Sequence, residues 1–329
     1  MNSVLRLGTR GSPLALWQAN AVAARLQATS GHACRIIVIK TSGDRLQEAP
    51  LSESGGKGLF VKEIEDALLR DEIDLAVHSS KDMPAILPDG LTIGAVLPRE
   101  DPLDAIVLPK KIALEADTAF DCGMMSFSDV VNVLGRSPSI GTSSVRRIAQ
   151  LTRLFPQARF TPIRGNLDTR LGKLDKGEHD AIVLAAAGLR RLGMTSRISA
   201  RVPSSACVPA PGQGIVAIEI REKDPRVGPL VGLIDDREGH EGLDAERAVV
   251  KALGGGCQTP IGALATVDAE NMLELIAAVI AVDGSRAVRS HARAPLEDAR
   301  GLGARVGARL LDEGAGDILE EVRRQNDGR

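Results

Sequence analysis

One cysteine lies on an unusually bare loop. Residues 253–262 read LGGGCQTPIG, so three glycines precede Cys257 and a Gln-Thr-Pro turn follows it. Because glycine has no side chain, such a loop lets a bulky group approach the sulfur. No histidine is near it in sequence, and no second cysteine forms a CxxC pair with it. The residues alone leave open an inert buried thiol and a sulfur accessible to a bulky group.

A carboxylate beside a lysine follows a buried apolar run. Residues 73–77 (IDLAV) predict a strand, and the segment HSSKDMP after it contains Lys81 and Asp82. A carboxylate in that place can act as a general acid or base, or stabilise a developing cation. An aspartate after a strand also commonly serves as a turn or cap residue. Both interpretations stay open at this point.

Arginines gather at turns that follow strands. Of the 41 basic residues 31 are arginine, whose planar guanidinium grips a carboxylate or phosphate with two hydrogen bonds. A GC-rich genome would also raise the arginine content, so composition alone decides little. Ligands of open α/β sheets bind at the carboxyl ends of strands, where helix N-termini add free N–H donors. An anion-binding cleft is therefore predicted from the turns GTSSVRR, IRGNLDTR and GLRRLG, which carry Ser143, Ser144, Arg146, Arg147, Arg164, Arg170, Arg190 and Arg191.

Strand and helix signals alternate through the first two hundred residues, which predicts an α/β architecture. A strand at 4–7 leads into a turn where Ser12 is a good N-cap and Pro13 suits the first helical position. A strand at 35–40 and an amphipathic helix at 58–70 follow. After about residue 236 the pattern becomes helix 242–253, strand 273–282 and helix 299–311. This last part predicts a smaller α+β domain.

Two pairs of segments resemble each other and occur in the same order. LRLGTRGSPLALWQ resembles PSIGTSSVRRIAQ, and EIDLAVHSS resembles EHDAIVLAA. Two similar lobes that share a cleft would explain this, and chance similarity of short strands is the alternative. The proline-containing segments 98–103 and 208–214 are expected to act as hinges between the lobes. Residues 109–138 give mixed signals and are interpreted as an insertion in the second lobe.

The bulk composition narrows the class of protein. The chain has 329 residues, 43% hydrophobic and 26% charged, with a net charge of −2. That balance argues against a nucleic-acid or membrane-surface binder. No apolar run resembles a signal peptide or a transmembrane helix. The four cysteines are far apart, which argues against a zinc or redox motif and predicts no metal site. A cytoplasmic location with reduced thiols is expected.

Together these segments resemble the hydroxymethylbilane synthase family, also called the porphobilinogen deaminase family. The resemblance runs from Leu5 into the C-terminal part, and several of its motifs are long and specific. They are TRGSPLALWQ, GGKGLFVKE, AVHSSKDMP, REDPLDA, GTSSVRR, RGNLDTRLGKLDKGEHDAIVLAAAGLRRLG, PAPGQG and GGGCQTPIG. GGKGLFVKE alone is glycine-rich but lacks the P-loop form, so it does not predict nucleotide binding.

The resemblance implies a fold and an activity. The fold is α/β, with two periplasmic-binding-protein-like lobes and a smaller C-terminal α+β domain. The implied domains are 1–99 with 214–234, then 104–208, then 238–329. The activity is that of a transferase that joins four porphobilinogen units head to tail onto a covalent dipyrromethane primer. Ammonia leaves at each addition, and hydrolysis then frees the linear tetrapyrrole hydroxymethylbilane for heme biosynthesis.

The resemblance also implies roles for residues and partners. Cys257 would attach the dipyrromethane through a thioether, and Asp82 matches the catalytic aspartate. Lys57 and Phe60 match a flexible lid, while Arg99 and Gln213 lie in the two hinges. A monomer that passes its product to uroporphyrinogen-III synthase is expected. The residues that match binding of cofactor and substrate carboxylates are Arg10, Ser12, Lys81, Thr142, Ser143, Ser144, Arg146, Arg147, Arg164, Arg170 and Arg191.

The chain departs from the family in its lid segment, and two other functions are alternatives. Where many members have a lysine just before GGKG, this chain has Glu53-Ser54, so one positive charge of the lid is absent. A non-catalytic two-lobed solute-binding protein for a polycarboxylate would explain the cationic turns but neither Cys257 nor Asp82. A thiol redox enzyme that uses Cys257 lacks a nearby partner cysteine.

Overall fold

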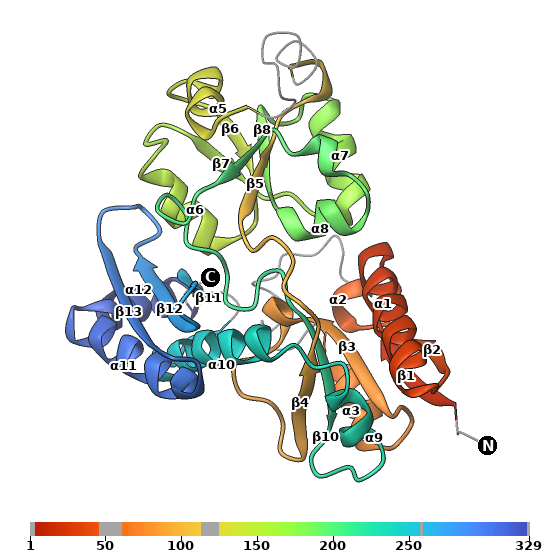
Figure 1. Ribbon diagram of the computed structural model, residues 1–329. Helices are drawn as coiled ribbons and strands as arrows, with labels where there is room; N and C mark the ends of the chain where they lie inside the picture. Colours follow the sequence, from red (N-terminus) through yellow and green to blue (C-terminus); the bar gives the residue numbers. More distant parts are fainter. Residues whose placement is uncertain (1–3, 46–60, 113–124, 257–258, 328–329) are drawn as a thin grey trace.

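The computed structural model describes residues 4–45, 61–112, 125–256 and 259–327 (Figure 1). The candidate residues Lys57, Phe60 and Cys257 therefore lie outside the described residues. In the described part, the strands form three sheets, two with five strands each and one with three. Each sheet has its own helices and its own apolar core, so the chain folds as two lobes and a smaller C-terminal domain. Within the described residues, every helix is too short or too polar to cross a bilayer.

The first lobe is built on a mixed sheet with strand order β2-β1-β3-β10-β4. β1 lies parallel to β2 and β3, whereas β10 lies antiparallel to β3 and β4. The chain thus returns to this lobe after forming the second one (Figure 1). Its strands are β1 (Leu5–Thr9), β2 (Cys34–Val38), β3 (Leu75–Ser79), β4 (Leu91–Val96) and β10 (Val216–Arg221). Its helices are α1 (Pro13–Ser30), α2 (Ser42–Arg45), α3 (Lys62–Leu69), the short 3₁₀ helix η2 (Ser80–Asp82) and α9 (Val227–Gly232).

The second lobe repeats this arrangement. Its strand order is β7-β6-β8-β5-β9, with β6 parallel to β7 and β8, and β5 antiparallel to β8 and β9. β6 and β8 thereby occupy the places of β1 and β3, which confirms the internal repeat. Its strands are β5 (Asp104–Val107), β6 (Ser139–Gly141), β7 (Arg159–Thr161), β8 (Ala181–Ala185) and β9 (Ala200–Val202). Its helices are α5 (Phe127–Leu134), α6 (Val145–Thr152), α7 (Leu167–Asp175), α8 (Ala186–Arg191) and η3 (Thr195–Arg197).

The C-terminal domain is an antiparallel meander with helices on one face. The sheet packs a continuous apolar core against α10 and α11, and its other face contacts the second lobe through Ala149 and Val208. Gly303 lets α11 approach α10 closely, because a Cβ atom there would lie 2.2 Å from the Ala245 carbonyl oxygen. The elements are α10 (Arg237–Ala252), β11 (Ile261–Val267), β12 (Met272–Ile280), β13 (Ala287–Pro295), η4 (Leu296–Asp298), α11 (Ala299–Asp312) and α12 (Ala315–Asp327).

Local sequence signals explain where several elements begin. The Ser12 hydroxyl accepts a hydrogen bond from the Ala15 amide, and Pro13 opens α1, as predicted. Helix α10 starts at Arg237, five residues earlier than predicted, because the Asp236 carboxylate accepts from the Gly239 amide and caps it. Residues 125–138, part of the segment interpreted as an insertion in the second lobe, contribute to the core of that lobe, because Val130 of α5 is fully buried.

Two connecting segments, 98–103 and 208–214, cross between the lobes. The Glu100 amide donates to the Gly214 carbonyl at 3.0 Å, and Arg99 Nε donates to the Gln213 carbonyl at 2.9 Å. Arg99 Nη1 also reaches the buried Glu246 carboxylate of α10 at 2.6 Å, which ties the crossing to the C-terminal domain. Gly214 has φ +89°, and a Cβ atom there would lie 2.2 Å from the Glu100 carbonyl oxygen. The crossing therefore requires glycine at this position.

Candidate functional site

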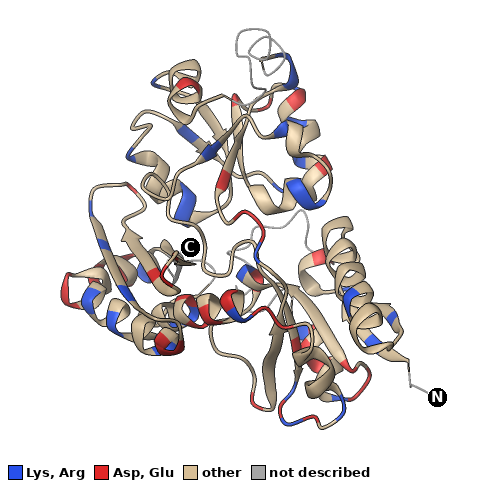
Figure 2. Cartoon of the chain, in the orientation of Figure 1, with Lys and Arg blue, Asp and Glu red and all other residues tan. Residues whose placement is uncertain are grey.

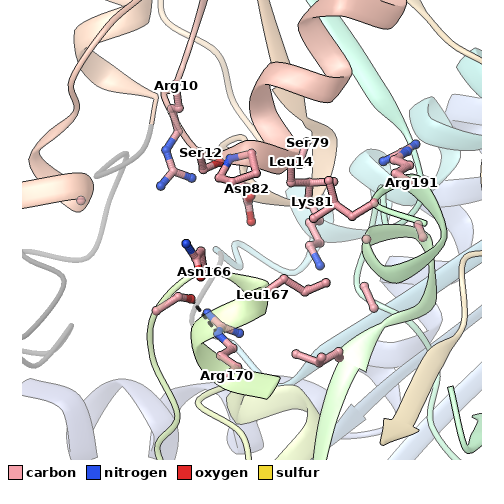
Figure 3. A pocket seen from close by; sticks show the side chains of 18 of the residues that line it. Arg10, Ser12, Leu14, Ser79, Lys81, Asp82, Asn166, Leu167, Arg170 and Arg191 are labelled. Carbon is pink, nitrogen blue, oxygen red and sulfur yellow. Dashed lines mark hydrogen bonds between the residues drawn. The ribbon is translucent and has the colours of Figure 1, made fainter. Parts of the chain in front are cut away.

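A cleft of about 790 Å³ lies between the two lobes (Figure 3). Its walls come from the turns after β1, β3, β6 and β7 and from the start of α8, so the strand-terminal turns of both lobes face one space. This is the arrangement expected of ligand sites in open α/β sheets. Nine of the candidate residues line the cleft: Arg10, Ser12, Lys81, Asp82, Ser143, Arg147, Arg164, Arg170 and Arg191.

Asp82 projects into the cleft from the first lobe. It ends η2, whose Ser80 amide donates a hydrogen bond at 3.0 Å to the carbonyl of Ile215, directly after the connecting segment 208–214. Figure 3 shows the Asp82 carboxylate directed toward Asn166 and Arg170 of the opposite lobe. In the described part of the chain this carboxylate forms no hydrogen bond or ion pair. An exposed carboxylate without a partner is available to a ligand.

Lys81 lies beside Asp82 in a more enclosed position. Burial and the neighbouring Arg147 lower the pKa of Lys81 to about 8, while Asp82 and Asp104 oppose the shift. Its ammonium donates to Gln213 Oε1 at 3.4 Å. The Lys81 side chain is thus mostly a cation at neutral pH, and it loses its charge as the pH rises above 8.

A buried carboxylate, Asp104, orients two of the candidate arginines. It is fully buried, and its oxygens accept from Arg146 Nη1 at 2.8 Å and from Arg147 Nη2 at 2.8 Å. Gln213 Nε2 adds a third donor at 2.9 Å. Burial opposes ionisation, but the two guanidiniums hold the pKa of Asp104 far below its usual range. Arg147 still lines the cleft, whereas Arg146 turns away toward Asp104 and the Val208 carbonyl.

The opposite wall comes from the turn between β7 and α7. Asn166 Oδ1 accepts from the Thr169 amide and caps α7, and Arg170 Nε donates to the Gly165 carbonyl at 2.9 Å. Burial and Arg147 lower the pKa of Arg170, which nevertheless stays charged at neutral pH. Figure 3 shows the Arg170 side chain on the wall opposite Asp82. Cation and carboxylate thus face each other across the cleft.

Two further arginines stand at the edges of the cleft. Arg10 Nε donates to the Asp44 carboxylate at 3.1 Å, so its charge is balanced by a neighbour from α2. Arg191 Nη2 donates to the Gly214 carbonyl at 2.6 Å, and its guanidinium lies over the Trp17 ring, 5.7 Å from the centroid. Burial lowers the pKa of Arg191 to about 10.

The other described candidates do not line the cleft but lie next to the segments that do. The Ser144 hydroxyl caps α6, and Thr142 Oγ1 accepts from the Ser144 amide at 3.2 Å. Arg99 and Gln213 lie at the crossing of the connecting segments. Sequence reasoning missed Asp104 and Asn166. Asp104 opens a strand within REDPLDA and Asn166 stands at a helix start within RGNLDTR, and those placements were the signals available for them.

A second, smaller cavity of about 90 Å³ adjoins the cysteine loop. Gly256 and Thr259, on either side of residues 257–258, line it together with Lys81, Ser144 and Arg146. Among the described residues, two buried polar atoms of its lining lack a hydrogen-bond partner, Ser80 Oγ and Arg146 Nε. Lys81 borders both cavities. The donor set facing this small space suits an anionic group.

The cations that line the interlobe cleft are a local cluster and do not belong to a larger basic surface. Figure 2 shows acidic and basic residues interspersed over the helices of the C-terminal domain, in keeping with the net charge of −2. The fold and the site therefore define a class: a two-lobed α/β protein whose interlobe cleft places the unpaired Asp82 carboxylate among several cations.

Comparisons with known proteins give the family. The model described as porphobilinogen deaminase, dipyromethane cofactor binding domain, matches residues 5–228, and the model of the C-terminal domain of porphobilinogen deaminase matches residues 242–312. A porphobilinogen deaminase of Syntrophobacter fumaroxidans is 44% identical over 98% of both chains. One of Acidithiobacillus ferrooxidans is 45% identical over 97% of this chain and 98% of its own. The chain belongs to the porphobilinogen deaminase family, whose members are transferase enzymes also called hydroxymethylbilane synthases.

Solved structures of substrate-binding and solute-binding proteins are similar at a greater distance. Substrate binding domain 2 of Lactococcus lactis GlnP in its open conformation gives a TM-score of 0.42 at 10% identity, covering 76% of this chain and 90% of that chain. An ancestral cationic amino acid solute binding protein gives 0.40 at 15% identity, covering 74% and 93%. At these scores the likeness adds nothing to the family assignment.

Proposed function

We propose that this protein carries out the reaction of its family, the stepwise joining of four porphobilinogen units into hydroxymethylbilane on a covalently bound dipyrromethane. The observation that carries the proposal is the free Asp82 carboxylate facing Arg170 in a cationic interlobe cleft, in a chain that matches the family over nearly its whole length. A solute-binding protein for a polycarboxylate would need the cations but would have no use for a free carboxylate among them.

The residues beside the cysteine loop fit the dipyrromethane. Its acetate and propionate groups are anions, and the small cavity next to Gly256 and Thr259 offers the cation Lys81 and the unpartnered donors Ser80 Oγ and Arg146 Nε. We propose that Lys81, Ser144, Arg146 and Arg147 hold these carboxylates, and that Cys257 is the point of attachment. When bound, the dipyrromethane supplies the pyrrole primer to which the porphobilinogen units are joined.

The cleft arginines bind the acidic side chains of the substrate. Each porphobilinogen carries two carboxylates, so the growing product is a polyanion that has to be held along its length. We propose that Arg10, Arg164, Arg170 and Arg191, with Ser12, Thr142 and Ser143 nearby, provide that hold. A guanidinium fork pairs with a carboxylate through two hydrogen bonds, so each contact fixes orientation as well as charge.

Asp82 performs the charge stabilisation that the reaction requires. Loss of ammonia from porphobilinogen leaves positive charge on its methylene and pyrrole ring. A fixed carboxylate within a cleft stabilises that charge more strongly than water does, because it needs no reorganisation. The same oxygens can accept hydrogen bonds from pyrrole N–H groups and take part in proton transfer to the leaving amine.

We further propose an organisation and a setting for the enzyme. We propose three domains, at 1–99 with 214–234, 104–208 and 238–329, and the presence of three separate sheets supports this division. The segments that hold Arg99 and Gln213 are the proposed hinges. Residues Lys57 and Phe60 act in a lid. The enzyme works as a cytoplasmic monomer and passes its product to uroporphyrinogen-III synthase.

Intact-protein mass spectrometry tests the proposal first. Freshly purified protein should carry the mass of two linked pyrroles on the peptide that contains Cys257, and addition of porphobilinogen should produce a ladder of further pyrrole units. Cys257→Ser should lack the adduct and all activity. Asp82→Asn should keep both fold and adduct but lose nearly all turnover. An unmodified thiol in active wild-type protein would sink the attachment site, and near-normal turnover of Asp82→Asn would move the catalytic role to another group.

A further inference from the structure

Two helices from different lobes meet beside the cleft (Figure 1). α1 presents Leu14 and Trp17, and α8 presents Gly188 and Arg191, each pair three residues apart. At Gly188 a Cβ atom would lie 3.6 Å from Leu14 Cδ2, and the Arg191 guanidinium carbon lies 5.7 Å from the centre of the Trp17 ring. Because residues three apart share one face of a helix, the Leu14–Gly188 and Trp17–Arg191 pairs belong to a single interlobe contact.

The end of α8 also binds the crossing of the two connecting segments. The Gly214 carbonyl accepts from Arg191 Nη2 at 2.6 Å and from the Glu100 amide at 3.0 Å. The preceding residue, Arg190, pairs through Nε with the Glu100 carboxylate at 2.8 Å. Arg191 therefore touches a helix of the first lobe, the crossing and the cleft at once.

We propose that Trp17 is a positioning residue whose indole face holds the Arg191 guanidinium where it can bind a substrate carboxylate. A guanidinium that stacks on a ring uses its face, so the N–H donors in its plane stay free. One of these donates to Gly214, and the others remain for a ligand in the cleft that Arg191 lines. The inference rests on the proposed function, because the ligand is a carboxylate of porphobilinogen or of the growing chain.

The same contact couples substrate binding to the position of the lobes. Trp17 belongs to the first lobe and Arg191 to the second, so a carboxylate that binds the stacked guanidinium acts directly on an interlobe contact. Trp17 is the single tryptophan of the chain and is 41% exposed, so the tryptophan fluorescence of the protein comes from this contact alone. The emission should change when porphobilinogen loads the cleft.

Substitutions at Trp17 separate positioning from packing. Trp17→Leu removes the ring face, whereas Trp17→Phe keeps a smaller one. Trp17→Leu should raise KM for porphobilinogen about three- to tenfold, the range that a partly desolvated cation–π contact supports, and leave kcat within about twofold. Trp17→Phe should lie between Trp17→Leu and wild type. Leu233→Ala, which removes an exposed apolar side chain of the first lobe away from the cleft, is the matched control and should leave KM unchanged.

A double-mutant cycle with Arg191→Lys decides whether Trp17 acts through Arg191. Lysine keeps the charge but offers no flat face. In the Arg191→Lys background, Trp17→Leu should therefore change KM by less than twofold. Independent effects that multiply, or a wild-type KM in the Trp17→Leu single variant, would overturn the proposal.

Fluorescence keeps this test separate from that of the proposed function. Arg191→Lys alone should shift the Trp17 emission before any substrate is added, since the contact exists in the free protein. Unchanged emission in that variant would refute the contact. Wild-type protein that carries the pyrrole adduct but releases no ammonia from porphobilinogen would refute the proposed function instead, while the emission shift of Arg191→Lys would stand.

Discussion

Replacing Asp104 by asparagine tests what holds the cationic wall of the cleft together. The substitution preserves the shape of the side chain, and its Oδ1 still accepts from Arg147 and Gln213. The new amide group, however, takes the place of the oxygen that Arg146 Nη1 approaches at 2.8 Å, so a donor then faces a donor. Two buried guanidiniums also lose the anion that they share. Breaking a buried pair in this way costs about 3–5 kcal/mol.

Urea unfolding followed by circular dichroism measures this loss as a fall in the free energy of unfolding. Glu297→Gln is the matched control, because it removes one partner of the Arg237–Glu297 pair, whose two side chains are 66% and 67% exposed. An exposed pair of this kind contributes about 0–1 kcal/mol. If Asp104→Asn were no less stable than the control variant, the argument that Asp104 anchors Arg146 and Arg147 would fail.

The pH dependence gives a second check on the same variant. Since the folded-state pKa of Asp104 is lowered, its contribution is present above the unfolded pKa of about 4 and is lost as the pH falls below it. The difference in stability between wild type and Asp104→Asn should therefore be full at pH 7 and shrink below about pH 4. A difference that grew as the pH fell would contradict the assignment.

Two further predictions concern Lys81 and the crossing. With a pKa of about 8, Lys81 loses its charge as the pH rises, so KM for porphobilinogen should rise above pH 8 in wild type, and Lys81→Gln should flatten the profile; a flat wild-type profile would contradict this. Gly177 and Gly214 both have positive φ, but only at Gly214 would a Cβ atom meet backbone. Gly177→Ala should cost about 1–2 kcal/mol and Gly214→Ala clearly more; equal losses in thermal unfolding would contradict it.

The sequence predicted the parts of the fold that depend on local signals. Ser12 and Pro13 at the start of α1 were visible because capping chemistry is confined to one turn of chain. The similarity of two pairs of segments predicted the two matching sheets, since β6 and β8 occupy the places of β1 and β3. Boundaries shifted where a cap was missed, as with Asp236 before α10.

Candidate residues separated into cleft and support only in three dimensions. Arg146 and Arg147 are neighbours in sequence and looked equivalent, yet Arg147 lines the cleft and Arg146 points behind it. Asp104 binds both guanidiniums, and Arg146 Nη1 also donates to the carbonyl of Val208, 62 residues away, which draws Arg146 from the cleft. No local pattern shows which of two adjacent arginines a distant acceptor will turn inward.

By itself, the sequence determined the chemical inventory: a cysteine on a bare loop, a carboxylate after a strand, and cations at strand-terminal turns. These follow from residue type and from contacts within a few positions along the chain. Only the tertiary structure decided that Asp82 faces Arg170 across the cleft and that Trp17 lies against Arg191. Those pairs join two lobes, and their distances are set by how two separately formed cores pack, which no short segment encodes.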